Sequence, residues 1–99
     1  MTGSAGNDTL NGGVGDDTMT GSEGNDTLNG QEDNDTINGG VNDDALDGGP
    51  GLDLLKGDAG ADTLTGPPND GKKDDVNGGA NIDVCQGPGA DLDILSFCP

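Results

Sequence analysis

The chain lacks most of the side chains on which enzymes rely. It contains no His, Arg, Trp or Tyr, and Phe97 is its only aromatic residue. Glu23 and Glu32 stand alone in turn-forming sequence, so an acid–base pair would have to come from the many aspartates of the turns. We therefore do not expect an enzyme.

Positive charge is also scarce. Three lysines, Lys56, Lys72 and Lys73, stand against 20 acidic residues, and the formal net charge is −17. Nucleic acids and anionic membrane surfaces bind clustered basic residues, so neither is an expected partner. The chain has no apolar run long enough for a membrane-spanning helix, and membrane insertion is not expected. The expected partner is a cation.

Apolar residues are too few for an ordinary core. Hydrophobic residues make up 27% of the chain, and 21 of the 99 residues are Gly. Such a composition, combined with the self-repulsion of the acidic residues, is typical of disordered chains. The chain must be neutralised before it can fold.

What the sequence does contain is a repeat of nine residues. Each copy places an aspartate five residues after a glycine and two residues before an apolar side chain. Regular copies fill 3–65, a longer copy with an inserted loop fills 66–77, further copies fill 78–95, and 96–99 form a C-terminal cap. We interpret 1–99 as a single repeat domain, because a fixed short period is typical of solenoids.

Each copy has two halves. Its first six residues are rich in Gly, Asn and Asp, which favour tight turns, and its last three predict a short strand with one inward residue. No window has helical periodicity. Two copies would close one coil, and successive coils would stack as parallel strands with turns along both edges.

The copies resemble G-G-x-G-x-D-x-U-x, the nonapeptide of the RTX (repeats-in-toxin) family. The resemblance covers residues 3–95. It implies an all-β fold, a right-handed parallel β-roll of about ten half-coils without helices. It also implies Ca²⁺ ions between stacked turns, because in the family the sixth-position aspartates and the surrounding main-chain carbonyls hold this hard cation.

Carried over by position, the resemblance assigns the ligands. The expected carboxylates are those of Asp8, Asp17, Asp26, Asp35, Asp44, Asp53, Asp62, Asp74 and Asp83. The expected carbonyls belong to Gly3, Gly6, Gly12, Gly13, Gly15, Gly21, Gly24, Gly30, Gly39, Gly40, Gly48, Gly49, Gly51, Gly57 and Gly60. Alternate copies share an edge, so the aspartates should form two files and hold roughly five to eight ions.

Several copies depart from the consensus. Residues other than Gly occupy the second and fourth positions of many turns, but Asn and Asp tolerate left-handed backbone, so we expect most turns to survive. The copy at 66–77 carries Pro67, Pro68 and the Lys72–Lys73 pair, and we expect it to weaken one or two sites.

We therefore expect a module that is disordered without Ca²⁺, folds on binding it, and forms part of a larger secreted protein. A disulfide between Cys85 and Cys98 would fit an oxidising compartment, although two separate thiols remain an alternative. Two other functions stay open. One is a calcium-stabilised ice-binding or adhesin solenoid, suggested by ranks of Thr such as Thr9, Thr27 and Thr63. The other is a disordered acidic binder of cations or minerals.

Overall fold

The computed structural model describes residues 1–66, 74–80, 84–86 and 94–96, with side chains in the first two of these ranges. These residues form ten β-strands and no helix. The strands are β1 (Thr9–Val14), β2 (Thr18–Glu23), β3 (Thr27–Glu32), β4 (Thr36–Val41), β5 (Ala45–Asp47), β6 (Leu54–Ala59), β7 (Thr63–Thr65), β8 (Asp75–Asn77), β9 (Val84–Gln86) and β10 (Ile94–Ser96).

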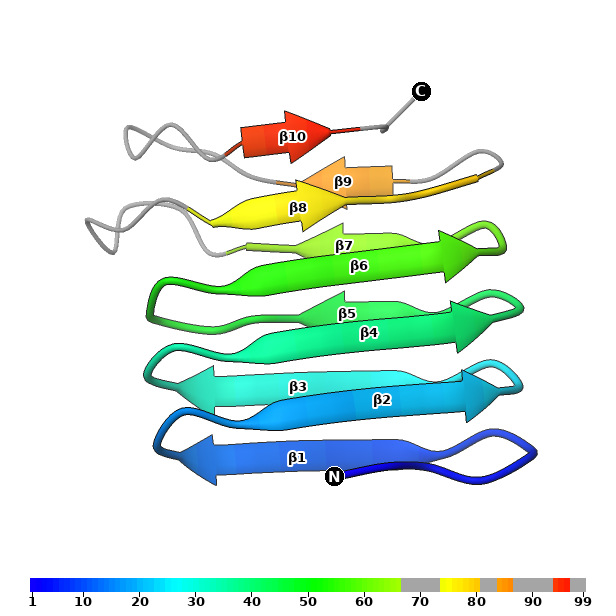
Figure 1. Ribbon diagram of the computed structural model, residues 1–99, viewed down its shortest axis with the longest axis horizontal. Helices are drawn as coiled ribbons and strands as arrows, with labels where there is room; N and C mark the ends of the chain where they lie inside the picture. Colours follow the sequence, from blue (N-terminus) through cyan, green and yellow to red (C-terminus); the bar gives the residue numbers. More distant parts are fainter. Residues whose placement is uncertain (67–73, 81–83, 87–93, 97–99) are drawn as a thin grey trace.

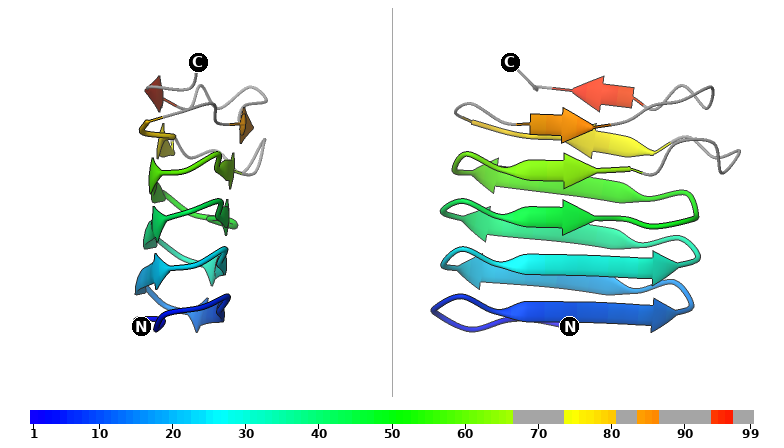
Figure 2. Two further views of the ribbon diagram at one scale, coloured as in Figure 1. Left: turned by 90° about the vertical axis from the view of Figure 1, so that its right-hand side faces the viewer. Right: turned by 180° about the vertical axis from the view of Figure 1, so that it is seen from behind.

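Odd and even strands form separate sheets. One sheet has the order β1-β3-β5-β7-β9 and the other β2-β4-β6-β8-β10, and every pairing is parallel. The chain passes from one sheet to the other at each turn and advances along the stack as a right-handed coil (Figure 1). Seen edge-on, the two sheets face each other across a thin slab whose principal extents are 36 × 31 × 12 Å (Figure 2). The predicted right-handed parallel β-roll is confirmed.

The register of the sheets follows the repeat. Leu10 pairs with Leu28 and Met19 pairs with Ile37, so each repeat position faces the same position one coil later. Leu55 pairs with Val76, and the register therefore survives the three-residue insertion between them. The last copy is offset. Leu95 pairs with Val76, whereas continuing the nine-residue period of the copies at 78–95 would place Ile94 there, so β10 is shifted by one residue from the repeat.

The core lies between the sheets and takes one apolar side chain from each of the strands β1 to β8, whose side chains the structure describes. Met19, Leu28, Ile37, Leu55, Leu64 and Val76 are fully buried, Leu46 is nearly so, and Leu10 lies at the end of the column. Each buried side chain of this size contributes about 1.5–3 kcal/mol. Because strand side chains alternate, the first-position glycine and the sixth-position aspartate face the same interior as the apolar residue.

Positive φ angles recur at the second and fourth positions of the turns. Glycine supplies most of them, as at Gly13 and Gly15. Asp33 and Asn42 adopt φ of 80° and 83° at the fourth position, as predicted for these residue types. Ser22 and Gln31 do the same at the second position, with φ of 96° and 81°, although neither residue favours this region. The turn geometry therefore overrides local preference.

Candidate metal centre

The sixth-position aspartates form two files along the two edges of the roll. In one file, the Oδ1 atom of each aspartate accepts a hydrogen bond from the backbone N–H of the aspartate one coil earlier. Asp8 N–H donates to Asp26, Asp26 N–H to Asp44 and Asp44 N–H to Asp62, at 2.7–2.9 Å. We call these contacts the inner ladder.

The second file has the same arrangement. Asp17 N–H donates to Asp35, Asp35 N–H to Asp53 and Asp53 N–H to Asp74, each at 2.8 Å. The last of these spans the insertion, since its partners are 21 residues apart rather than 18. These two files are the two-sided arrangement expected from the alternation of repeat units.

The inner ladder uses only one oxygen of each carboxylate. In Asp26, Asp35 and Asp44 the other oxygen, Oδ2, is buried and has no hydrogen-bond partner, and the same is true of Oδ2 in Asp17, which begins the second file. Burying an ionised oxygen without a partner is costly unless a charge compensates it. These atoms therefore mark positions where a positive ion would be strongly favoured.

Each first-position glycine is closely surrounded by such an oxygen and by a main-chain carbonyl, so no larger residue fits there. A Cβ atom added to Gly21 would lie 2.4 Å from Asp26 Oδ2 and 2.5 Å from the carbonyl oxygen of Gly39, one coil later. Gly30 has the same surroundings, with Asp35 Oδ2 at 2.2 Å and Gly48 O at 2.5 Å from such a Cβ. A carboxylate and a carbonyl oxygen thus converge closely enough to share one Ca²⁺, whose bonds to oxygen are about 2.3–2.6 Å long.

The pKa values reflect this crowding. Burial raises the pKa of Asp44 to about 6, and the neighbouring charges of Asp62, Asp26 and Asp43 act in the same direction. Burial also raises the pKa of Asp35; the hydrogen bond from Asp17 N–H acts against this rise, and the charges of Asp17, Asp16 and Asp33 add to it. Both carboxylates lie in the middle of their files, where the surrounding acidic residues disfavour ionisation unless a cation is present.

The available donors are all hard oxygen atoms. Among residues 1–66 and 74–80, no group of three His, Cys, Asp or Glu side chains is placed to hold a metal alone. Zinc and related metals prefer nitrogen and sulfur, whereas Ca²⁺ accepts carboxylate and carbonyl oxygens in flexible geometry. The residues present therefore fit Ca²⁺, with main-chain carbonyls completing the ligand set.

A second ladder on the outside of the turns was not anticipated from the sequence. The fifth-position side chains Asn7, Asn25 and Asp43 accept hydrogen bonds from the backbone N–H groups of Asn25, Asp43 and Ala61, at 2.9–3.2 Å. On the other edge, Asp16 and Asn34 accept from Asn34 and Leu52 N–H, at 3.0 and 2.9 Å. The signal was visible, because the fifth position is Asn or Asp in five consecutive copies and then becomes Leu52 and Ala61.

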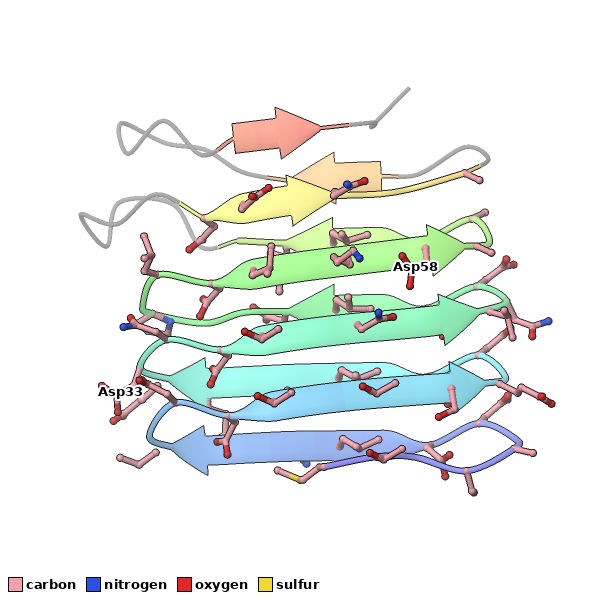
Figure 3. All side chains as sticks on the ribbon, in the orientation of Figure 1. Asp33 and Asp58 are labelled. Carbon is pink, nitrogen blue, oxygen red and sulfur yellow. The ribbon has the colours of Figure 1, made fainter. Side chains whose placement is uncertain are left out.

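Two aspartates that replace turn glycines take separate roles (Figure 3). Asp33 Oδ2 accepts a 2.9 Å hydrogen bond from Gly15 N–H, which ties two neighbouring turns of one edge together. Asp58 lies at the other edge, where its carboxylate is 3.9 Å from the ammonium group of Lys56. Both pairs are exposed, so the ion pair contributes little to stability.

The predicted ligands do not all reach equivalent places. Asp26, Asp35, Asp44, Asp53, Asp62 and Asp74 are buried in the two files. Asp17 is half-buried, and its Oδ2 is likewise buried without a hydrogen-bond partner. Asp8 is also half-buried, but its Oδ2 accepts a hydrogen bond from Ser4 N–H. Of the predicted carbonyls, those of Gly21, Gly30, Gly39 and Gly48 lie beside first-position glycines one coil earlier. Asp83, the Lys72–Lys73 pair and Cys98 lie outside the described residues.

The threonine ranks on the outer faces are interrupted, as the sequence indicates. Ala45 lies between Thr27 and Thr63 in one sheet, and Leu54 follows Thr36 in the other. A hollow of about 190 Å³ marks the gap at Ala45. A continuous flat array of threonines is therefore absent from the described strands.

Comparison with known proteins identifies the repeat. The family model of the RTX calcium-binding nonapeptide repeat matches in four copies, at residues 1–28, 12–46, 20–55 and 38–66. Together these matches cover two thirds of the chain and contain most of the inner ladder. No curated protein sequence and no solved structure gives a significant match. The described part of the chain contains no helix that could cross a membrane.

Proposed function

The chain belongs to the RTX calcium-binding nonapeptide repeat family, and from this premise we propose that it is a calcium-dependent folding module. Without Ca²⁺ the chain is disordered, and with Ca²⁺ between its turns it folds into the β-roll. The family is a structural repeat and not a catalytic one, and we propose the same for this chain.

One observation carries the proposal. The same carboxylates that join successive coils through Oδ1 present a buried Oδ2 without a hydrogen-bond partner, as in Asp26, Asp35 and Asp44. We propose that these oxygens ligate Ca²⁺ together with first-position carbonyls such as Gly39 O. The proposed side-chain ligands are Asp17, Asp26, Asp35, Asp44, Asp53, Asp62 and Asp74, with Asp83 continuing the series in sequence.

The charge of the chain supports a switch. A net charge of −17 opposes compaction, and one apolar side chain per strand gives a thin core. Roughly five to eight divalent ions would neutralise most of that charge while filling the two files. Since the sites exist only when coils stack, the binding free energy becomes folding free energy.

RTX repeats are typical of secreted proteins, and we propose that this chain is part of one. The low calcium of the cytosol would keep the chain unfolded, and millimolar extracellular calcium would fold it. A disulfide between Cys85 and Cys98 would form in the same environment and would close a loop worth about 3 kcal/mol. Mass spectrometry of the protein without reducing agent tests this bond.

The test of the proposed function is a far-UV circular dichroism titration of the chelator-stripped protein. We expect a steep transition from coil to β-structure with Ca²⁺ and none with Mg²⁺, which demands stricter geometry and dehydrates reluctantly. A spectrum that stays that of a disordered chain up to about 10 mM Ca²⁺, beyond the range of weak extracellular sites, would refute the switch. That outcome would favour a disordered acidic binder.

A further inference from the structure

The first turn of the roll, residues 3–8, differs from those that follow in how its carboxylate is bonded. Asp8 Oδ2 accepts a 2.7 Å hydrogen bond from Ser4 N–H, and the Ser4 hydroxyl lies 3.4 Å from the same oxygen. In the next two turns of this edge, the Oδ2 atoms of Asp26 and Asp44 have no hydrogen-bond partner. The oxygen that we propose as a calcium ligand elsewhere is thus already compensated at Asp8.

The backbone explains the difference. Ser4 and Ser22 are the same residue type at the same repeat position, and they adopt different conformations. Ser22 has a φ of 96°, and its hydroxyl lies 3.5 Å from the carbonyl oxygen of Gly3 rather than near Asp26. Ser4 has no positive φ, unlike its counterparts Gly13, Ser22, Gln31, Gly40, Gly49, Asp58 and Gly79. This conformation directs the Ser4 N–H at the carboxylate of its own turn.

Residues 1–5, which lead into this turn, are held against the neighbouring sheet. Thr2 pairs with Thr20 and Ala5 pairs with Glu23, so residues 1–5 lie along the outer edge of β2. Gly3 N–H and Gly6 N–H donate to the carbonyls of Thr20 and Glu23, each at 2.8 Å. These contacts fix the backbone on both sides of Ser4.

We propose that the turn at residues 3–8 is a hydrogen-bonded cap closed by Ser4 and not a cation site, so that the calcium array on this edge begins with the turn at 21–26. This inference rests on the proposed function. A carboxylate and a carbonyl oxygen do converge here as in the later turns, since a Cβ on Gly3 would lie 2.8 Å from Asp8 Oδ2 and 2.5 Å from Gly21 O. An ion binding Asp8 Oδ2 would have to compete with the hydrogen bond that Ser4 N–H already donates to this oxygen.

The test counts the calcium ions bound per chain at saturation, by equilibrium dialysis and elemental analysis. We expect Asp8→Asn to bind as many ions as the parent protein, and Asp26→Asn, its counterpart in the next turn of the same edge, to bind at least one fewer. A loss of one ion in Asp8→Asn would overturn the proposal. If no variant and no parent protein binds Ca²⁺, the proposed function itself fails, which is a different outcome.

Ser4→Gly provides a gain-of-site test that does not depend on removing an aspartate. Glycine can adopt the positive φ of Gly13, which would free Asp8 Oδ2, so we expect one additional bound ion. Ser22→Gly is the matched control and should leave the number of bound ions unchanged.

Amide hydrogen exchange adds a readout independent of ion counting. We expect the Ser4 amide to remain protected in the calcium-loaded protein, and unprotected exchange at Ser4 would overturn the cap.

Discussion

Asp44 Oδ1 accepts a 2.8 Å hydrogen bond from the backbone N–H of Asp26, which lies 18 residues earlier and one coil away. The other oxygen of the same carboxylate is buried without a hydrogen-bond partner. One side chain therefore connects two coils and also presents the atom that we propose as a calcium ligand. Folding and ion binding cannot be separated at this residue, because the carboxylate is in place only when the coils are stacked.

Replacing Asp44 by Asn tests this dual role. The amide oxygen can still accept from Asp26 N–H, but the negative charge is lost. We expect the midpoint of the Ca²⁺ titration, followed by circular dichroism, to rise by about tenfold or more, since ligand charge sets the affinity of calcium sites. Asp43→Asn is the matched control. It removes one charge but keeps an acceptor for Ala61 N–H on the outside of the turn, so an equal rise in both variants would contradict the assignment.

Gly39→Ala should disturb a proposed calcium ligand without changing its chemical identity. The added Cβ would lie 2.4 Å from Asp44 Oδ2, so the carboxylate would have to move. We expect a loss of about 1–3 kcal/mol in the free energy of unfolding at saturating Ca²⁺, typical of overpacking in a dense interior. Gly13→Asn is the control, because a Cβ there meets nothing within 4 Å and Asn tolerates the positive φ of this position better than other residues. Equal losses in the two variants would refute the specific contact.

The period of the sequence was sufficient to predict the coil, the two sheets and the column of inward residues from Leu10 to Val76. These features depend only on strand alternation and on equal spacing. The sequence did not predict that Oδ1 of an inner-ladder aspartate such as Asp44 accepts a hydrogen bond while its Oδ2 has no such partner. This difference depends on the distance between stacked coils, whose equivalent residues are 18 apart in the sequence. The conformation of Ser4 escaped prediction for a related reason. Its sequence context is similar to that of Ser22, and the difference between their backbone conformations appears only in the folded structure.

Gln31→Gly should stabilise the roll. Gln31 holds a φ of 81°, in the left-handed region that costs an ordinary residue about 1–2 kcal/mol and glycine almost nothing. Glycine loses more entropy on folding, so we expect a net gain of up to about 1 kcal/mol in chemical unfolding at saturating Ca²⁺. Glu32→Gly, at the adjacent position without a positive φ, should instead destabilise the protein. A loss of stability in Gln31→Gly would show that its side chain matters more than its backbone.

Acid should partly replace calcium in folding the metal-free chain. Burial raises the pKa of Asp44 from its ordinary value of 3.8 to about 6 and also raises that of Asp35. A raised pKa means that the folded state binds its proton more tightly, so this stabilisation is present below pH 3.8 and is lost as the pH rises through about 6. In chelator, we expect the β-structure seen by circular dichroism to increase as the pH falls from about 7 to about 4, in the range of the carboxyl groups. With calcium the trend should reverse, because protons compete with the ion for the same oxygens. Asp44→Asn should weaken the acid-induced gain, and a metal-free spectrum that does not change over this range would contradict the expectation.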